Sequence, residues 1–238
     1  MTGAGALRGV QTVGGWLLDF ALPPRCPGCG EITTAVDLFC GECWGSLEFL
    51  NGGCDCCGLA LKPGDDGTCL TCERSNGPLG RVRAAIAYGE VSRSIAMRLK
   101  YGRKIALAKT MAGMMKRPMQ GLDPEATLVP VPLHRWRLWG RGFNQSVLIA
   151  RAMKRPMDGD LLRRIRATPR LKGLNPSQRR RTVERAFALR PGAKVEGRSF
   201  ILVEAVITTG ATAEACAKVL RGAGASSVDL IAFARVLG

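Results

Sequence analysis

Residues 201–212 constrain the fold more than any other part of the chain. They form an apolar run rich in β-branched residues that passes through Glu204-Ala205 into a Thr-Thr-Gly-Ala-Thr loop. Residues 213–221 follow, with Val219 and Leu220 on one helical face. A buried strand that enters a helix through a loop of small residues is the repeating unit of α/β folds. The sequence therefore predicts an α/β domain.

The loop after this strand has the composition of a phosphate-binding site. Gly210 and Ala211 let backbone N–H groups approach an anion, and the hydroxyls of Thr208, Thr209 and Thr212 add donors. The following helix directs its positive end toward the same place. The alternative is a turn that only reverses the chain, which any α/β protein needs. We predict phosphate binding at these residues, because this loop sequence is more specific than a lone glycine.

The charge of the chain indicates a polyanionic ligand or partner. The 238 residues include 35 Lys and Arg against 19 Asp and Glu, which gives a formal net charge of +16. Ten basic residues lie between positions 163 and 190, with Glu184 as the one acid in that segment. A solvated basic face is one interpretation. We favour contact with an anion, because like charge at this density is unfavourable without one.

Cysteines are concentrated near the N-terminus, where nine of the ten precede residue 73. Eight of them make four Cys-x-x-Cys pairs, and two such pairs supply the four thiolates of a structural zinc site. Disulfides are the alternative, but the absence of a secretory signal favours metal. We predict two zinc ions and leave open which pairs share an ion. The predicted ligands are Cys26, Cys29, Cys40, Cys43, Cys54, Cys57, Cys69 and Cys72.

The sequence divides into three predicted parts. Residues 1–24 have apolar side chains at helical spacing and are expected to form a short amphipathic helix that packs on the body, with attachment to a membrane surface as the alternative. Residues 25–77 are the cysteine-rich double zinc-binding module, and residues 78–238 are the α/β domain. No apolar stretch reaches the ~18 residues that a membrane span needs, so we expect a cytoplasmic protein without one.

The α/β domain shows an alternating pattern of strands and helices. Residues 132–141 are expected to form a loop, and a helix to begin near Phe143. Strands are expected at 81–88, 127–131, 199–204 and 227–233, and helices at 91–101, 104–115 and 213–221.

Several motifs, taken in order, resemble those of the ComF/GntX family. They are the Cys-x-x-Cys pairs, Leu99-Lys100-Tyr101, the Val-Pro-Val-Pro-Leu-His run at 129–134, Arg-Gly-Phe-Asn-Gln at 141–145 and Ile-Thr-Thr-Gly-Ala-Thr at 207–212. The resemblance covers residues 26–238. It implies a double zinc ribbon followed by a type I phosphoribosyltransferase domain with a central, mostly parallel sheet. Members of this family are linked to DNA uptake in competent bacteria, and many relatives are named phosphoribosyltransferases or amidophosphoribosyltransferase-like.

The resemblance also implies roles for particular residues. Phosphoribosyl pyrophosphate (PRPP), together with Mg²⁺, would be held at residues 208–212, with Glu204 as the carboxylate for the ribose hydroxyls. Arg135, Arg137 and Arg141 would neutralise the diphosphate, a task that suits the guanidinium fork, and Lys100 would contact the same ligand. The basic segment at 163–190 would include a loop that closes over the substrate.

The sequence is consistent with two functions of different classes. The first is an enzyme that transfers ribosyl phosphate from PRPP to a nitrogen acceptor. The chain departs from the family pattern here, since Ala205 replaces the second of two adjacent acids, Leu171 a usual Gln and Thr182 a usual Asn. The second function is a non-catalytic protein that binds single-stranded DNA or a partner in the DNA-uptake machinery. The charge favours this second function, although Trp136 and Trp139 are among few side chains on which bases would stack.

Overall fold

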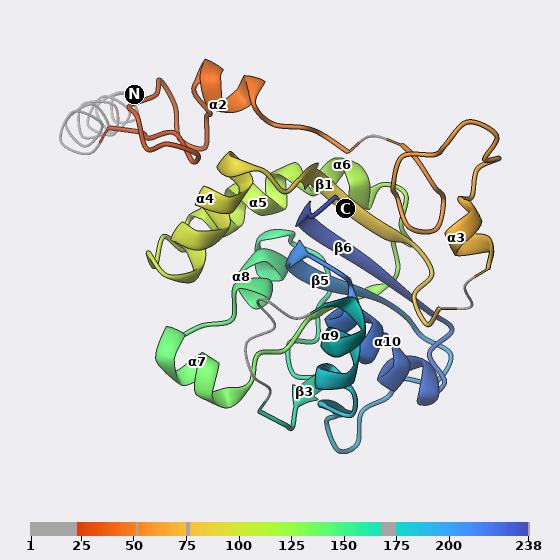
Figure 1. Cartoon of the computed structure of the whole chain (residues 1–238). Helices are drawn as coiled ribbons and strands as arrows, with labels where there is room; N and C mark the ends of the chain where they lie inside the picture. The colour runs from red at the N-terminus through yellow and green to blue at the C-terminus, as the bar shows by residue number, and fades with distance from the viewer. Residues whose placement is uncertain (1–22, 51, 75–76, 168–174, 238) are drawn as a thin grey trace, which may run out of the picture. The chain divides into compact units, whose positions relative to one another are not determined.

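The computed structural model describes residues 23–50, 52–74, 77–167 and 175–237 (Figure 1). The chain divides into two compact units, Met1–Leu47 and Glu48–Gly238. The boundary falls between the two groups of cysteines, and the predicted division at residues 24 and 77 stays a prediction. The amphipathic helix expected within residues 1–24 lies almost wholly outside the described residues.

The described part of the first unit is a small cysteine-centred fold. Its one α-helix in that range, α2 (Gly41–Gly45), begins at Cys40, whose side chain accepts a hydrogen bond from the Cys43 N–H. Cys26 and Cys43 are 0% and 7% exposed, and together with Pro27 they are its buried apolar side chains. A unit with so small a core depends on another source of stability, and bound metal supplies it in domains of this size.

A four-stranded parallel sheet forms the centre of the second unit (Figure 1). Its strand order is β1-β6-β5-β2, and the two central strands are buried along most of their length. Such near-continuous apolar strands are typical of a parallel sheet that is covered on both faces. The strands are β1 (Val82–Ala87), β2 (Thr127–Pro130), β5 (Ser199–Ile207) and β6 (Ser227–Arg235).

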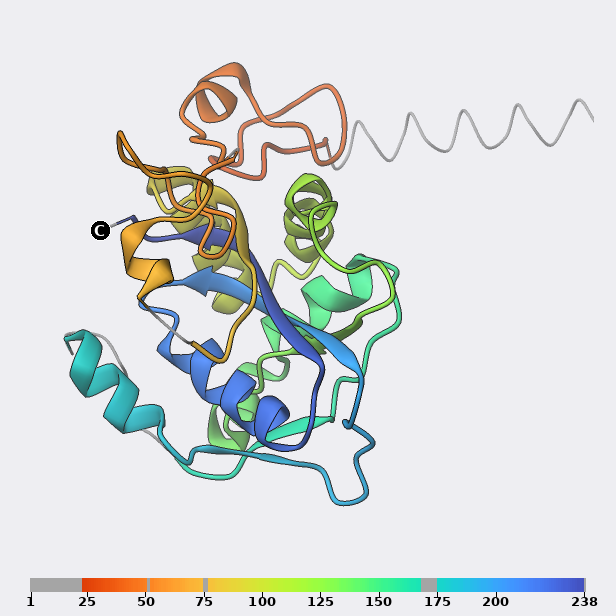
Figure 2. The same ribbon diagram turned by 90° about the vertical axis from the view of Figure 1, so that its right-hand side faces the viewer.

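Helices cover both faces of this sheet, as Figure 2 shows. One face packs against α5 (Leu107–Met114) and α8 (Gln145–Ala152), with α4 (Glu90–Lys100) and α6 (Lys116–Met119) beside them. The other face packs against α10 (Ala211–Gly222). The antiparallel pair β3 (Leu162–Arg164) and β4 (Phe187–Leu189) and the helix α9 (Pro176–Val183) lie over α10.

The predicted α/β class, the parallel sheet and the two groups of metal ligands are confirmed. Strands and helices occur where the apolar pattern indicated them, although β5 continues to Ile207 rather than ending near residue 204. Among the described segments, every helix is too short or too polar to cross a lipid bilayer.

The prediction of a loop over residues 132–141 is wrong, because this segment contains the helix α7 (Arg135–Arg141). His134 caps the helix through its ring, which accepts a hydrogen bond from the Trp136 N–H, and Gly142 ends it at φ +83°. A left-handed residue at this position is a common helix terminator and suits glycine. The basic segment likewise contains α9 and parts of the β3–β4 pair, while residues 168–174, where a closing loop was expected, lie outside the described residues.

Candidate metal centres and ligand site

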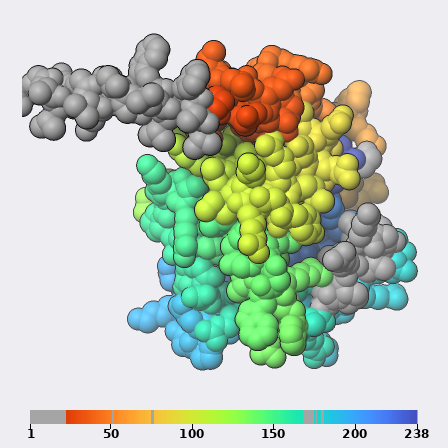
Figure 3. Space-filling view, turned by 90° about the vertical axis from the view of Figure 1, so that its left-hand side faces the viewer, coloured from red at the N-terminus to blue at the C-terminus, as the bar shows by residue number. Residues whose placement is uncertain are grey.

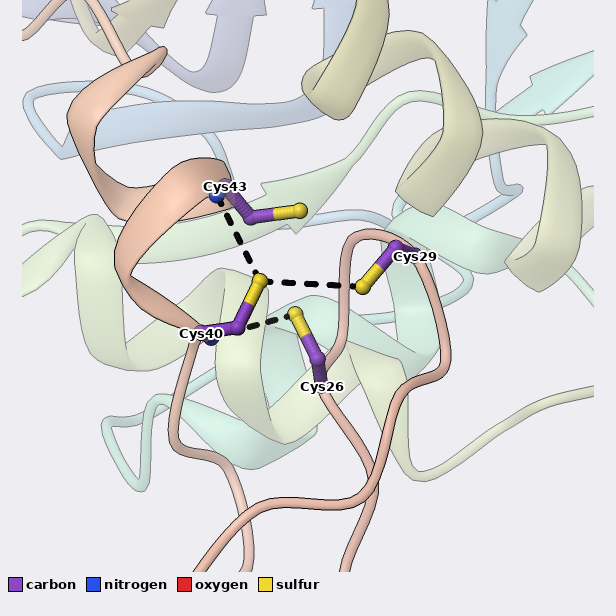
Figure 4. Close-up of side chains that lie close together, drawn as sticks. All are labelled: Cys26, Cys29, Cys40 and Cys43. Atoms are coloured by element: carbon purple, nitrogen blue, oxygen red, sulfur yellow. Dashed lines mark hydrogen bonds between the residues drawn. The ribbon is translucent and has the colours of Figure 1, made fainter.

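The first group of cysteines places four sulfur atoms around one point (Figure 4). The Sγ atoms of Cys26, Cys29, Cys40 and Cys43 all lie within 4.8 Å of one another, and Cys29 and Cys40 are 3.7 Å apart. Zinc–sulfur bonds of about 2.3 Å in a tetrahedron require sulfur–sulfur distances of about 3.8 Å. A disulfide would require about 2.0 Å. The geometry therefore fits a tetrahedral ion and not a cystine.

Backbone groups around Cys26 favour the thiolate form that a metal requires. Burial alone would raise the pKa of this thiol, but N–H groups of Cys40, Cys29 and Gly28 lower its pKa to about 6. The Cys40 N–H lies 3.3 Å from the Cys26 sulfur. The turn of the first Cys-x-x-Cys pair and the start of α2 thus converge on one sulfur, which is a thiolate at neutral pH.

The second group repeats this arrangement in the second unit. The Sγ atoms of Cys54, Cys57, Cys69 and Cys72 lie within 4.8 Å of one another, and Cys57 and Cys69 are 3.8 Å apart. Burial again opposes ionisation of Cys54, but backbone N–H groups of Cys69, Cys57 and Cys56 lower its pKa to about 6. A short helix, α3 (Leu70–Glu73), begins directly after Cys69.

The chain thus has two four-cysteine sites for structural zinc. The Cys-x-x-Cys pairs combine in sequence order: the first two pairs form one site and the last two form the other. Four protein ligands leave no open position for water or substrate, so the ions have structural roles. Cys56 lies outside both sites and its thiol donates to the Gly80 carbonyl at 3.2 Å, while Cys216 is fully buried on α10, as expected for a small apolar residue.

The second zinc site is joined to the parallel sheet by hydrogen bonds that its backbone carbonyl groups accept. The Val82 N–H of β1 donates to the Cys56 carbonyl at 2.7 Å, and Arg83 donates to the Asp55 carbonyl at 2.8 Å. At the end of β6, Arg235 donates to the Cys57 carbonyl. These bonds make the second zinc site part of the same unit as the sheet.

The predicted phosphate loop lies between the end of β5 and the start of α10. Gly210 is in the left-handed region at φ +76°, and a Cβ added there would meet no atom within 4 Å. The side chain of Thr208 is exposed, and those of Thr209 and Thr212 are partly exposed, whereas Ala211 is buried. The first turn of a twelve-residue helix therefore faces open space through a residue without a side chain, which suits the approach of a phosphate.

Glu204 lies on β5 just before this loop, in a partly buried position between two cations. Burial raises the pKa of its carboxyl to about 7, and the nearby charges of Lys100 and Arg164 lower it only in part. Burial also lowers the pKa of Lys100, which faces the Glu204 carboxylate and the Arg141 guanidinium. The neighbouring Ala205 is 1% exposed. Glu204 is thus the member of the Glu204-Ala205 pair that is accessible at this site.

Arg164 is a residue of this site that sequence reasoning did not single out. It lies on β3 with its guanidinium 5.3 Å from the centroid of the Phe187 ring. Burial lowers its pKa, as does the positive charge of Arg137, while Glu204 opposes this change. In the sequence it was one of ten basic residues in a segment, and only the β3–β4 pairing places it opposite Glu204.

The three predicted diphosphate-binding arginines all belong to α7. Arg141 donates a hydrogen bond to the Gln145 side chain and stands over the Tyr101 ring, so it is fixed beside Lys100. Arg137 is within electrostatic range of Arg164, and Arg135 is exposed at the start of the helix. The structure therefore brings Lys100, Arg137 and Arg141 to the Glu204 side of the molecule.

His134 and Asn144 hold the ends of the segment that carries these arginines. Burial, together with the charges of Arg164, Arg135 and Arg137, lowers the pKa of His134, so the ring is neutral at neutral pH. Asn144 caps α8 by accepting from the Ser146 N–H at 3.0 Å and donates to the Val131 carbonyl at 3.0 Å. Asn144 therefore caps α8 and joins its start to the backbone that follows β2.

A cavity of about 140 Å³ separates the second zinc site from the phosphate loop. Cys57 and Cys72 line one side of it, and Thr209 and Gly210 line another. The second zinc site and the phosphate loop therefore line the same cavity.

Comparisons with known proteins agree with these features. Residues 17–74 match the model of the double zinc ribbon domain. Competence protein F of Haemophilus influenzae is 28% identical over 230 residues, which cover 92% of this chain and 93% of that protein. DNA utilization protein YhgH of Salmonella typhi is 30% identical over 179 residues, 71% of this chain and 78% of the relative. Competence protein ComFC of Bacillus subtilis is 26% identical over 208 residues, 81% of this chain and 83% of the relative. With its two four-cysteine sites and the parallel sheet that follows them, this chain belongs to the ComF family.

Proposed function

We propose that the site at the carboxyl end of β5 binds PRPP or a closely related phosphoribosyl ligand. The observation that supports this most is the position of Glu204, which lies near the charges of Lys100 and Arg164 and, on β5, four residues before the open loop that leads into α10. A phosphoribosyl ligand has hydroxyls that a carboxylate binds and phosphates that cations and backbone N–H groups bind. Ligands of α/β proteins bind at this end of the sheet.

Each part of such a ligand can be assigned to a group of the described residues. The 5-phosphate is assigned to residues 208–212, and the ribose hydroxyls to Glu204. The diphosphate is assigned to Lys100, Arg137 and Arg141, which lie on the cationic side of the carboxylate. Mg²⁺ binds proteins through one or two carboxylates together with substrate phosphates, and Glu204 is the carboxylate available here. The ion would supply neutralisation of diphosphate charge.

Transfer of ribosyl phosphate to a nitrogen acceptor is the reaction that this site would support. Positive charge that develops at the anomeric carbon as diphosphate leaves is stabilised by Glu204, and the arginines stabilise the leaving group. A second acid at position 205 would not help, because Ala205 is 1% exposed and a carboxylate there would be buried. Binding without turnover is the alternative that the single carboxylate leaves open.

The cellular role that we propose is the handling of DNA taken up by the cell, in the cytoplasm. Relatives along most of the chain are named competence proteins and DNA utilization proteins. The net charge of +16 supports a nucleic-acid partner. In the non-catalytic alternative, the protein binds single-stranded DNA or a component of the uptake machinery.

Thermal unfolding with added PRPP and Mg²⁺ tests the ligand site. We expect millimolar PRPP to raise the Tm of the wild-type protein, because a ligand that binds only the folded state stabilises it. Gly210→Val should abolish this rise, since its side chain fills the open space before α10.

Gly192→Val is the matched control for Gly210→Val. Gly192 has φ +71° and, like Gly210, open space around an added Cβ, so the variant carries similar backbone strain away from the site. It should retain the PRPP-induced rise. An equal loss of the rise in both variants, or no rise in the wild type, would contradict the proposal.

A further inference from the structure

Three aromatic side chains stand in solvent at the end of α4 and on α7. Tyr101, Trp136 and Trp139 are 64%, 61% and 82% exposed. The two tryptophan rings meet edge to face, with centroids 5.8 Å apart and planes at 86°. The Arg141 guanidinium lies 5.4 Å from the centroid of the Tyr101 ring and so joins the two elements. We call Tyr101, Trp136 and Trp139 the α7 aromatic surface; Figure 3 shows α7, in green, at the surface beside the yellow segment of α4.

The packing of α7 does not explain these rings. No residue of this helix is buried, and Leu138 between the tryptophans is itself 40% exposed. His134 caps the start of the helix through its ring and Gly142 ends it through its backbone N–H, so neither end depends on the indole rings. Large rings held in water on an anchored helix are typical of a surface that a partner covers.

The charge of the chain around the α7 aromatic surface is predominantly positive. Residues 90–157, which include α4, α5, α7 and α8, contain fourteen Lys and Arg against three acids, Glu90, Asp123 and Glu125. Arg135, Arg137 and Arg141 belong to α7 itself, and Arg103 and Lys104 follow Tyr101 in exposed positions. The partner of this surface must therefore be strongly anionic as well as able to cover aromatic rings.

We propose that the α7 aromatic surface binds single-stranded nucleic acid, with bases stacked on Trp136 and Trp139 and phosphates held by the neighbouring cations. Aromatic rings inside a cationic strip are the elements from which sequence-tolerant single-strand sites are built. A duplex does not fit this chemistry, because its bases are already stacked on one another. The edge-to-face arrangement leaves ring faces of the tryptophans free for a base. This surface adjoins the proposed PRPP site and shares Arg137 and Arg141 with it, whereas Trp136 and Trp139 have no assigned role in binding PRPP.

An acidic protein is the competing partner, since Trp, Tyr and Arg also serve as anchors of protein interfaces. Such interfaces surround their anchors with a polar rim of mixed character. The excess of fourteen cations over three acids in residues 90–157 matches the continuous negative charge of a polyphosphate backbone, so we favour nucleic acid.

Fluorescence anisotropy of a labelled thymidine oligonucleotide of about 20 residues, long enough to span the site, provides the test. The full chain and three variants, Trp136→Ala, Trp139→Ala and Trp139→Phe, are titrated at about 50 mM and 200 mM salt. Trp44→Ala is the matched control, because Trp44 is also exposed, at 55%, but lies in the first unit with its ring 6.0 Å from Phe39. Competition with inorganic polyphosphate and with polyglutamate separates base stacking from charge.

We expect Trp139→Ala to weaken oligonucleotide binding about tenfold, the size of one lost base stack, and Trp136→Ala to act in the same direction. Trp139→Phe should restore part of the loss, and Trp44→Ala should bind as the wild type. All variants should bind polyphosphate equally and keep the PRPP-induced rise in Tm.

Three results would overturn the proposal. Alanine variants that bind the oligonucleotide as tightly as the wild type would show that charge alone is responsible. An equal loss of polyphosphate binding would show that the rings support the helix and not bases. Polyglutamate binding with the same dependence on Trp139 would assign the surface to an acidic protein.

Discussion

Arg235, at the end of the last strand, donates a hydrogen bond to the carbonyl oxygen of Cys57, 178 residues earlier in the chain. Together with the bond from Val82 to Cys56, it fixes the second zinc site to two neighbouring strands of the sheet. The first zinc site belongs to the other compact unit. The two zinc ions therefore stabilise different parts of the protein.

Removal of one ligand from each site should have different consequences. Cys57→Ser should lower the Tm of the α/β unit by about 5 to 10 °C, as expected for a loss of about 2 to 3 kcal/mol in a domain of this size. It should also reduce the PRPP-induced rise in Tm, because Cys57 and Gly210 line one cavity. Cys29→Ser, the control, should leave that transition and the ligand effect unchanged.

Zinc analysis of the same proteins provides an independent check. The wild type should contain about two zinc ions per chain and each variant about one, as four-thiolate coordination requires. An equal effect of both substitutions on the α/β transition would contradict a division of roles between the sites.

Much of this architecture follows from local patterns in the sequence. The strands β1, β2, β5 and β6 are apolar runs at the expected positions, and four Cys-x-x-Cys pairs have few ways to bind metal. The pairing of sites needed the structure, since spacing allows a crossed arrangement as well. The helix α7 was not predicted, because Pro132 before it and Gly140 and Gly142 at its end indicate a loop when hydrogen bonds to His134 are unknown.

The candidate ligand site was predictable only where it is continuous in sequence. The sequence alone predicts residues 204–212 as a ligand site, because a strand, a small-residue loop and a helix follow one another there. Lys100 and Arg164 reach Glu204 from positions 104 and 40 residues away along the chain. No local pattern separates Arg164 from the nine other basic residues around it; its partial burial and the pairing of β3 with β4 do so.

Glu204 should make stability depend on pH. Its pKa is raised from 4.5 to about 7 in the folded protein, so the native state holds a proton that the unfolded state releases between these values. Stability from this group is thus full below about pH 4.5 and is lost as the pH rises through 7. Across this window, we expect the unfolding free energy of Glu204→Gln to change by about 1 to 3 kcal/mol less than that of the wild type. Urea unfolding at a series of pH values measures it, and parallel curves for wild type and variant would contradict the assignment.

Asn144 should contribute to stability through both ends of its amide. Asn144→Ala removes the cap of α8 and the hydrogen bond to the Val131 carbonyl, at a cost of about 1 to 2 kcal/mol. Asn175→Ala is a matched control, because Asn175 accepts from the Gln178 N–H at the start of α9 in an exposed position. Its effect should be below about 1 kcal/mol, the lower part of the range for caps. The urea midpoints of the two variants measure this difference, and equal midpoints would contradict the larger contribution of Asn144.

Calorimetric titration with PRPP in the presence of Mg²⁺ tests the central claim most directly. The account predicts binding to the wild-type protein and about tenfold weaker binding to Glu204→Gln, because the loss of a charge-assisted hydrogen bond to the ribose hydroxyls costs about 1.5 kcal/mol or more. The affinity of the wild type should also rise as the pH is raised through 7, where Glu204 ionises. No heat of binding at millimolar PRPP, or equal affinity for the wild type and Glu204→Gln, would contradict the account.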